Sequence, residues 1–279
     1  MTRATLAEVL QPALRDGYAV AGLVVLGWED ARAYVAAAQA EGTAVILQAG
    51  PACRAHTPLP VLAAMFRHLA EAASVPVVAH LDHGRDRAEC LAAIEHGFTS
   101  VMFDGSRLPL DRNIEETAAI AELARSRGVS CEGEVGFVGY RDAEPSQPTR
   151  PEDAARFARE TGVDAVAVSV GNVHLQHRAE AVIDMAAVRA VSAATRVPLV
   201  IHGGSGVPPS MRTHLSRSTS VCKFNIGTEV RMAFGAALRD VLASDPDRFD
   251  RIEILRDTEP RVTEAARKAI RSLQGAATP

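Results

Sequence analysis

Three histidines stand where short apolar segments of the chain give way to polar residues. They are His83, His174 and His202, and His83 directly follows Asp82. Imidazoles from separate segments suit a divalent metal, and Zn²⁺ bound by three of them keeps a fourth position open for a substrate or water. The pattern therefore predicts a zinc centre with a carboxylate beside it, which suits acid/base and Lewis-acid chemistry.

A hydrogen-bonded place in the core or in a loop is the ordinary alternative for any single histidine. We expect it for His80, which lies inside the apolar segment 77–81. We expect a structural role also for the five that do not end a segment in this way: His56, His68, His96, His177 and His214. Other polar side chains do end apolar segments: Asp104, Glu132, Glu134 and Asn225.

Two loops of the chain are suited to binding an anion. Residues 203–206 are Gly-Gly-Ser-Gly and 225–228 are Asn-Ile-Gly-Thr, and each loop precedes an expected helix. Backbone N–H groups at a helix start bind phosphate. One such loop is weak evidence because turns need glycine, but two in consecutive units favour phosphate. A metal beside a phosphate site indicates a phosphorylated carbonyl substrate.

An alternation of apolar segments and helical patterns positions these residues. Strands are expected at 18–25, 43–48, 77–81, 99–103, 129–134, 164–170, 198–202 and 221–226. Helices are expected at 29–41, 59–73, 87–96, 112–127, 151–160, 184–194, 209–216 and 228–243. Eight such units match an α/β fold, the (β/α)8 TIM barrel, which keeps its chemistry at the carboxyl ends of the strands. A doubly wound open sheet is the competing architecture, and it requires a reversal of strand order.

Length and composition limit the remaining possibilities. The 279 residues contain no linker, so we expect a single domain over 1–279 with extra C-terminal helices, one short and one longer, in 245–272. The net charge of −4 indicates no preference for nucleic acid or for a membrane surface. Four widely spaced cysteines and the lack of an apolar leader indicate a reducing cytoplasm.

The sequence resembles the class II, metal-dependent ketose-bisphosphate aldolases, the family of fructose- and tagatose-bisphosphate aldolases. The resemblance extends from about residue 6 to 243. Five motifs carry it: His-Leu-Asp-His-Gly at 80–84, Met-Phe-Asp-Gly-Ser at 102–106, Glu-Gly-Glu-Val-Gly at 132–136, Ile-His-Gly-Gly-Ser-Gly at 201–206 and Asn-Ile-Gly-Thr-Glu at 225–229.

The resemblance implies a zinc ion held by His83, His174 and His202. It implies reversible cleavage of a ketose (bis)phosphate to dihydroxyacetone phosphate and an aldehyde, in which zinc stabilises an enediolate. Asp82 resembles the group that exchanges a proton with the aldehyde oxygen, and Asn225 a group that faces the substrate. The implied phosphate contacts are Gly203, Gly204, Ser205, Asn225, Ile226, Gly227 and Thr228.

Asp104 and Glu134 match family positions that support the ligands or bind a metal in an alternative position. For Glu132 and Glu134, ion pairs at a strand end are the ordinary alternative. Family resemblance further implies a homodimer or homotetramer and the use of a monovalent cation beside the phosphate.

The sequence departs from the family pattern around the substrate. Gly-Leu-Val at 22–24 replaces Ala-Phe-Asn, so Val24 stands where a polar amide is usual. Leu175 replaces the glycine after the second zinc histidine, where it is expected to crowd the phosphate or cation site. In the loop that normally carries an acidic pair, Asp142 is the closest match and Glu144 the second choice, within 141–144.

Three alternatives to a ketose-bisphosphate aldolase remain. The first is the same metal chemistry on a singly phosphorylated or modified ketose or sugar acid. The second is a non-catalytic partner subunit of an aldolase, which has no need of a complete set of zinc ligands. The third is a metal-free Schiff-base aldolase, for which Lys223 is the only candidate lysine at a strand end.

Overall fold

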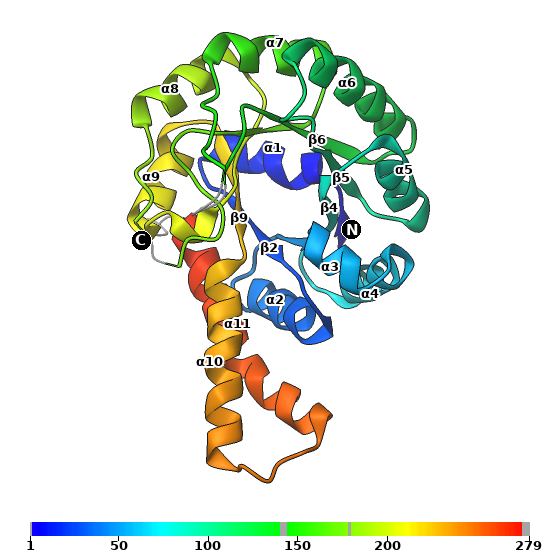
Figure 1. Cartoon of the computed structure of the whole chain (residues 1–279), viewed down its shortest axis with the longest axis vertical. Coiled ribbons are helices and arrows are strands. Elements are labelled where there is room, and N and C mark those ends of the chain that lie inside the picture. The colour runs from blue at the N-terminus through cyan, green and yellow to red at the C-terminus, as the bar shows by residue number, and fades with distance from the viewer. Residues whose placement is uncertain (1, 140–143, 178–179, 275–279) are drawn as a thin grey trace.

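The computed structural model (Figure 1) describes residues 2–139, 144–177 and 180–274. Its centre is a closed barrel in which eight parallel strands pair with their neighbours in the chain and the first also pairs with the last. The strands are β2 (Val20–Val24), β3 (Val45–Ala49), β4 (Val77–Gly84), β5 (Ser100–Phe103), β6 (Ser130–Val135), β7 (Ala165–Val168), β8 (Leu199–Ile201) and β9 (Val221–Ile226). The TIM barrel is thereby confirmed, and the open doubly wound sheet is excluded.

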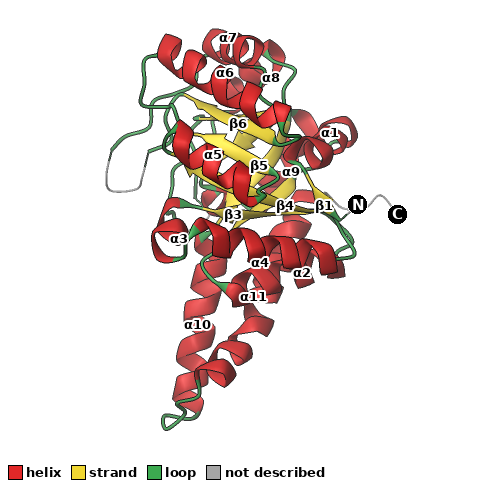
Figure 2. Ribbon diagram, turned by 90° about the vertical axis from the view of Figure 1, so that its right-hand side faces the viewer, coloured by secondary structure: helices red, strands yellow, loops and turns green. Residues whose placement is uncertain are grey.

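Helices follow the strands and surround the barrel (Figures 1 and 2). They are α2 (Trp28–Ala40), α3 (Pro51–His56), α4 (Leu59–Ala72), α5 (Arg87–His96), α6 (Leu110–Ser126), α7 (Pro151–Thr161), α8 (Met185–Ala194), α9 (Pro209–Ser218) and α10 (Thr228–Ser244), with a 3₁₀ turn, η1 (Gly204–Gly206), before α9. Among the described residues, no helix combines the length and the apolar character needed to cross a membrane.

An N-terminal segment closes the barrel at the end opposite the predicted site. Strand β1 (Arg3–Ala4) pairs with the start of β4, and helix α1 (Leu6–Asp16) follows. Leu6 and Leu10 of α1 are fully buried in a cluster with Val20 and Val200, which lie near the starts of their strands. Burial of these side chains excludes water from that end, so the carboxyl ends of the strands form the accessible mouth.

The structure corrects the sequence-based expectations at three places. Helices α1 and α3 were not expected, although Thr5 caps α1 in a reciprocal capping box with Glu8. The tail forms one helix, α11 (Arg251–Gln274), so the prediction of a short and a longer helix was wrong. Pro260 lies inside α11, which packs against α2 and α10. Tertiary packing therefore outweighs the local helix-breaking tendency of proline.

Helices α10 and α11 form a hairpin that projects beyond the barrel wall (Figures 1 and 2). The far part of the hairpin exposes apolar side chains, with Phe249 92% and Ile252 77% accessible. The near part returns to the barrel, where the backbone N–H of Ala19 donates to the carbonyl of Leu273 at 3.1 Å. The hairpin is thus anchored to the barrel at one end and apolar at the other.

Arg212 of α9 joins the last elements of the chain to the mouth of the barrel. Its side chain is 1% exposed. Its Nε donates to the carbonyls of Gly204 and Val207, and its two Nη atoms donate to the carboxylate of Glu229 in α10. Nη1 also lies 3.2 Å from the hydroxyl of Ser272 in α11, to which it donates. Because the planar guanidinium meets acceptors on three elements, this residue fixes the η1 turn against α10 and α11.

We predict that Arg212→Met lowers the free energy of unfolding by about 3 kcal/mol, because it leaves the buried carbonyl of Val207 without its donor and removes the partner of Glu229. Arg127→Met, at an exposed arginine, is the control and is expected to change stability by less than about 0.5 kcal/mol. Urea unfolding followed by circular dichroism measures both. Equal stability of the two variants would contradict this role of Arg212.

Candidate metal centre and active site

The three histidines predicted as metal ligands come together at the mouth of the barrel. His83 ends β4, His202 directly follows β8, and His174 lies in the segment after β7. The ring centroids of His83 and His202 are 4.6 Å apart, and those of His174 lie 5.4 and 5.6 Å from them. One ring nitrogen of each lies within 4.8 Å of the other two. Closure of the barrel therefore converts residues 119 positions apart (83 to 202) into one cluster.

Two nitrogens of this cluster are buried without a hydrogen-bond partner among the described residues, namely His83 Nε2 and His202 Nδ1. The opposite nitrogens are engaged: His83 Nδ1 donates to Asp104 Oδ2 at 2.6 Å, and His202 Nε2 lies 3.3 Å from Glu132 Oε1. Buried polar atoms normally have partners, and metal-binding imidazoles normally donate through their other nitrogen to a carboxylate. The arrangement fits a divalent metal.

Glu134 offers a further oxygen to the same space. Its Oε2 is buried without a hydrogen-bond partner and lies 3.3 Å from His202 Nδ1 and 3.9 Å from His83 Nδ1. His83, Asp104 and Glu134 form a second group whose potential ligand atoms lie within 4.8 Å of one another. The geometry therefore accommodates both roles expected of Asp104 and Glu134, as support for the ligands and as ligands in an alternative position.

Charges around His83 favour a cation at this point. Burial disfavours a charged imidazole, but the carboxylates of Asp82, Asp104 and Glu134 outweigh it and raise the pKa of His83 to about 10. Burial, with the neighbouring His83 and His202, lowers the pKa of His174 to about 3. For the carboxyl group of Glu134, burial acts in the opposite direction and raises the pKa to about 6. The carboxylates around His83 thus favour a positive charge at this point, and the neutral ring of His174 can offer a nitrogen lone pair to a metal.

A fully buried ion pair lies directly beneath the histidines. Lys223 Nζ donates to Glu132 Oε2 at 2.7 Å and lies 3.3 Å from His80 Nε2. His80 Nδ1 is 2.8 Å from the hydroxyl of Ser100, so His80 is a hydrogen-bonded core histidine, as expected. The amine of Lys223 is buried, paired with a carboxylate and absent from the cavity wall. These contacts leave it no access to a substrate carbonyl and remove the support for a Schiff-base aldolase.

Asp82 is held with one oxygen bound and the other directed to the cavity. Its Oδ1 accepts from Gln48 Nε2 at 2.8 Å and from Asn225 Nδ2 at 3.1 Å. Its Oδ2 lies near Gly50, where an added Cβ would be only 3.5 Å away. Burial opposes ionisation, but the nearby imidazoles and Lys223 prevail and lower the pKa of Asp82. Asp82 is thus an oriented carboxylate beside the three histidines.

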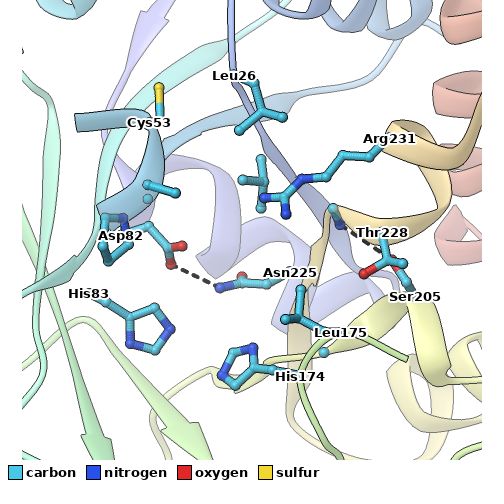
Figure 3. Close-up of a pocket in the computed structure, with 16 residues that line it drawn as sticks. Leu26, Cys53, Asp82, His83, His174, Leu175, Ser205, Asn225, Thr228 and Arg231 are labelled. Carbon is cyan, nitrogen blue, oxygen red and sulfur yellow. Dashed lines mark hydrogen bonds between the residues drawn. The ribbon is translucent and has the colours of Figure 1, made fainter. Parts of the chain in front are cut away.

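A cavity of about 300 Å³ opens at this mouth, and Asp82, His83, His174 and Asn225 line it (Figure 3). Both predicted anion-binding loops reach its wall, through Gly203 and Ser205 from one and Gly227 and Thr228 from the other. The Ser205 hydroxyl accepts from the backbone N–H groups of Gly227 and Glu229, each at 3.3 Å. The two loops therefore form one surface at the start of α10.

Two of the predicted phosphate contacts do not line the cavity. Ile226 is fully buried in the core, and Gly204 is buried where an added Cβ would lie 2.9 Å from the carbonyl oxygen of Asn225. The side chain of Ile226 packs in the core, and the close approach of η1 to β9 leaves no space for a side chain at Gly204. Asp142 lies outside the described residues, as does Arg141. Glu144 pairs with Arg107 at 2.5 Å.

The departures from the family pattern cluster on the cavity wall. Val24 and Leu175 both line it. Leu175 is 49% exposed and has a φ of +59°, a left-handed conformation that L side chains rarely adopt and that glycine adopts freely. The glycine usual at this position is therefore explained by the backbone, and Leu175 adds an apolar side chain to the wall.

Three residues of the site were not singled out by the sequence analysis. Gln48 ends the apolar segment of β3 and orients Asp82. Arg54 of α3 donates to the carbonyls of Ala49, Asp82 and His83 and pairs with Glu89. It thereby holds the end of β4, where His83 has a φ of +51°. Arg231 of α10 lines the cavity. A polar residue at a strand end was a usable signal for Gln48, whereas arginines within helical patterns gave none.

Comparisons with known proteins agree with this geometry. The family model "Fructose-bisphosphate aldolase class-II" matches residues 4–278. The chain is 36% identical to a fructose-bisphosphate aldolase of Geobacillus stearothermophilus, with 91% of both chains covered. It is 34% identical to a 6-phospho-5-dehydro-2-deoxy-D-gluconate aldolase of Shouchella clausii, covering 97% of this chain and 94% of that protein. The crystal structure of the YdjI aldolase from Escherichia coli K12 superposes with a TM-score of 0.83 at 28% identity, covering 98% of this chain and 99% of that one.

We predict that Lys223→Met lowers the free energy of unfolding of the metal-free protein by about 3–5 kcal/mol, because Glu132 is left as a buried charge without its cation. The double variant Lys223→Met/Glu132→Gln should recover part of this loss, since it removes both charges. Lys268→Met, at the only other lysine and an exposed one, is the matched control. Additive losses in the double variant would show that the two groups do not interact.

Proposed function

We propose that this chain, which belongs to the class II fructose-bisphosphate aldolase family, cleaves a ketose phosphate reversibly to dihydroxyacetone phosphate and an aldehyde. We infer zinc, held by His83, His174 and His202, as its metal. The observation that carries this proposal is the convergence of three imidazoles, two of them with buried unpaired nitrogens, beside an oriented carboxylate. Bound zinc would act as a Lewis acid that withdraws electron density from the ketose carbonyl.

The residues of the chain divide the remaining tasks between them. Asp82, with its Oδ2 toward the cavity, takes the proton of the C4 hydroxyl during cleavage and returns it during condensation. Gln48 and Asn225 hold its other oxygen, so that the free oxygen keeps its direction. Asn225 Oδ1 is buried without a protein partner among the described residues, which leaves it available for a substrate hydroxyl.

Phosphate binding is proposed for the surface formed by Gly203, Ser205, Gly227 and Thr228. The N–H groups of Gly227 and Glu229 at the start of α10 donate to the Ser205 hydroxyl, which keeps its own proton for an anion. The dipole of α10 favours an anion at this point. A monovalent cation beside the phosphate is part of the proposal, although Leu175 now occupies the position of the usual glycine. Phosphate held here places the carbonyl of a triose between it and the histidines.

The identity of the ketose is the open part of the proposal. The two curated relatives carry different substrate names, fructose bisphosphate and 6-phospho-5-dehydro-2-deoxy-D-gluconate, at 36% and 34% identity. Because the metal ligands are complete while Val24 and Leu175 alter the wall, the second candidate is the same chemistry on a singly phosphorylated or modified ketose or sugar acid. A non-catalytic partner subunit is disfavoured by the complete ligand set.

We further propose that the protein forms a homodimer or homotetramer and works in the cytoplasm, without nucleic acid or membrane partners. The exposed apolar side chains of Phe249 and Ile252 support self-association. All four cysteines are free and buried, in keeping with a reducing compartment.

Removal of metal is expected to abolish carbon–carbon cleavage. The purified protein should contain about one zinc ion per chain. Chelation should lower the cleavage of fructose or tagatose bisphosphate, or of the related sugar acid, to background, and added Zn²⁺ should restore it. His202→Ala should lose bound zinc, while His214→Ala, at an exposed histidine, should keep it. Undiminished cleavage by the chelated protein would refute the proposal, and stoichiometric zinc without any cleavage would favour the partner-subunit alternative.

Asp82→Asn should lower kcat by about 10²–10⁴-fold while zinc content stays unchanged, because the amide keeps the shape of the side chain but cannot accept the proton. Asp111→Asn, at an exposed aspartate of α6, serves as the control for general effects of the substitution. Steady-state kinetics with a coupled assay for dihydroxyacetone phosphate measures both variants. A loss confined to KM would assign Asp82 to binding alone.

A further inference from the structure

Asp82 and His83 face the same cavity although they are neighbours in the sequence. Along a regular strand, successive side chains point to opposite faces. In β4, Leu81 packs in the core cluster that includes the surrounding helices, and Val78 packs in the cluster inside the barrel. By this alternation Asp82 faces the barrel interior, and a regular strand would direct His83 to the helices. Instead, His83 lines the cavity together with Asp82 (Figure 3).

A β-bulge at the end of β4 explains this arrangement. The pairing of β4 with β5 is regular up to Leu81 and resumes at Gly84 after a shift in register, so that Asp82 and His83 together lie opposite a single residue of β5. His83 has a φ of +51°, which a residue other than glycine keeps only where surrounding contacts hold it. Because a bulge redirects a side chain, the imidazole of His83 turns from the helices to the mouth of the barrel.

Arg54 of α3 binds the bulge on the side of β3. The pairing of β3 with β4 ends at Ala49 and Leu81, before the bulge begins. Beyond this point the guanidinium supplies the hydrogen bonds: Nη1 donates to the carbonyl of Asp82 at 2.6 Å, and Nη2 donates to the carbonyl of His83 at 2.9 Å. Nη1 donates also to the carbonyl of Ala49. One side chain therefore joins the end of β3 to both residues of the bulge.

The contacts on both sides of the bulge are close and mostly buried. The side chain of Arg54 is 5% exposed, and its Nε and Nη2 donate to the carboxylate of Glu89 in α5 at 3.0 and 3.1 Å. Because the planar guanidinium is bound along its edges, it has a fixed orientation. On the side of β5, an added Cβ on Gly84 would lie 2.6 Å from the carbonyl oxygen of Met102. The chain therefore returns to β5 through a residue without a side chain.

We propose that Arg54 is a positioning residue, which stabilises the bulge that turns His83 into the cavity beside Asp82. The tasks of His83 in metal binding and of Asp82 in proton transfer rest on the proposed function, whereas the bulge and its contacts do not. Without Arg54, the carbonyls of both residues lose these donors and the φ of His83 loses its constraint. The imidazole and the carboxylate then lose their mutual orientation. A role of Arg54 in stability alone is the alternative.

The test compares Arg54→Met and Arg54→Lys with two controls. Arg87→Met removes a positive charge at an exposed arginine of α5. Leu10→Ala leaves a cavity at the opposite end of the barrel, and so lowers stability without touching the bulge. Competition with a chelator measures the Kd for zinc, and visible absorption of the Co²⁺-substituted protein reports the ligands. Steady-state kinetics measures kcat and KM with the ketose phosphate that the wild type cleaves.

In Arg54→Met, the Kd for zinc should rise about 10- to 100-fold, as expected when a contact that orients the ligands is lost. The cobalt spectrum should change, and kcat should fall by a similar factor with little change in KM. Arg54→Lys should lose less, because its ammonium keeps the charge and some of the donors. Both controls should keep the wild-type Kd, spectrum and kcat. A wild-type Kd and spectrum in Arg54→Met, or the same losses in Leu10→Ala, would overturn the proposal.

Hydrogen exchange in the metal-free proteins separates this proposal from the aldolase function. The backbone N–H of Asp104 donates to the carbonyl of Gly84 at 2.9 Å, directly after the bulge. Relative to the amides of β8, it should exchange about tenfold faster in Arg54→Met than in Leu10→Ala. If the wild type binds no zinc or cleaves no ketose phosphate, the proposed function fails, and this comparison alone decides the role of Arg54. Equal exchange in the two variants refutes that role. If Arg54→Met does not fold, Arg54→Lys is judged by the same measurements.

Discussion

The carboxylate of Glu132 links the buried lysine of the barrel to one of its three clustered histidines. One oxygen accepts from Lys223 of β9, and the other faces His202 after β8. Both partners are fully buried, and so is Glu132 itself. Burial opposes its ionisation, but Lys223 and the neighbouring histidines hold the pKa of Glu132 well below its usual range. Glu132 therefore stays ionised, and the ring of His202 is fixed with Nε2 toward Glu132 and Nδ1 toward Glu134.

This constraint links stability to function. A lysine–glutamate pair inside a barrel costs desolvation that apolar residues of the same volume would avoid. Here the pair also has a positioning role: Glu132 orients His202, so that a nitrogen of His202 lies close to nitrogens of His83 and His174. Asp104 likewise orients His83 by accepting a hydrogen bond from its Nδ1. Arg54 donates to the backbone carbonyl of His83 and so holds the end of β4. Three supports, one directly after β5, one on β6 and one on α3, thus hold His83 and His202 in place.

The barrel and the convergence of its three histidines were largely predictable from the sequence, because both depend on strands whose apolar runs end in polar residues. β9 and α5 have the expected bounds, and the cluster of His83, His174 and His202 follows once the strands close. The single C-terminal helix was not predictable, since Pro260 breaks the local pattern and only packing on α2 and α10 keeps α11 continuous. Arg54 and Arg231 were not predicted as site residues, because the sequence of a helix does not show whether an arginine side chain points toward the cavity or toward solvent.

Zinc K-edge X-ray absorption of the zinc-loaded protein, before and after addition of dihydroxyacetone phosphate, tests the central claim most directly. The account predicts three imidazole nitrogens at about 2.0–2.1 Å, with an oxygen-containing open position that changes when the triose phosphate binds. A zinc environment with fewer imidazoles, or one that the triose phosphate leaves unaltered, would contradict it.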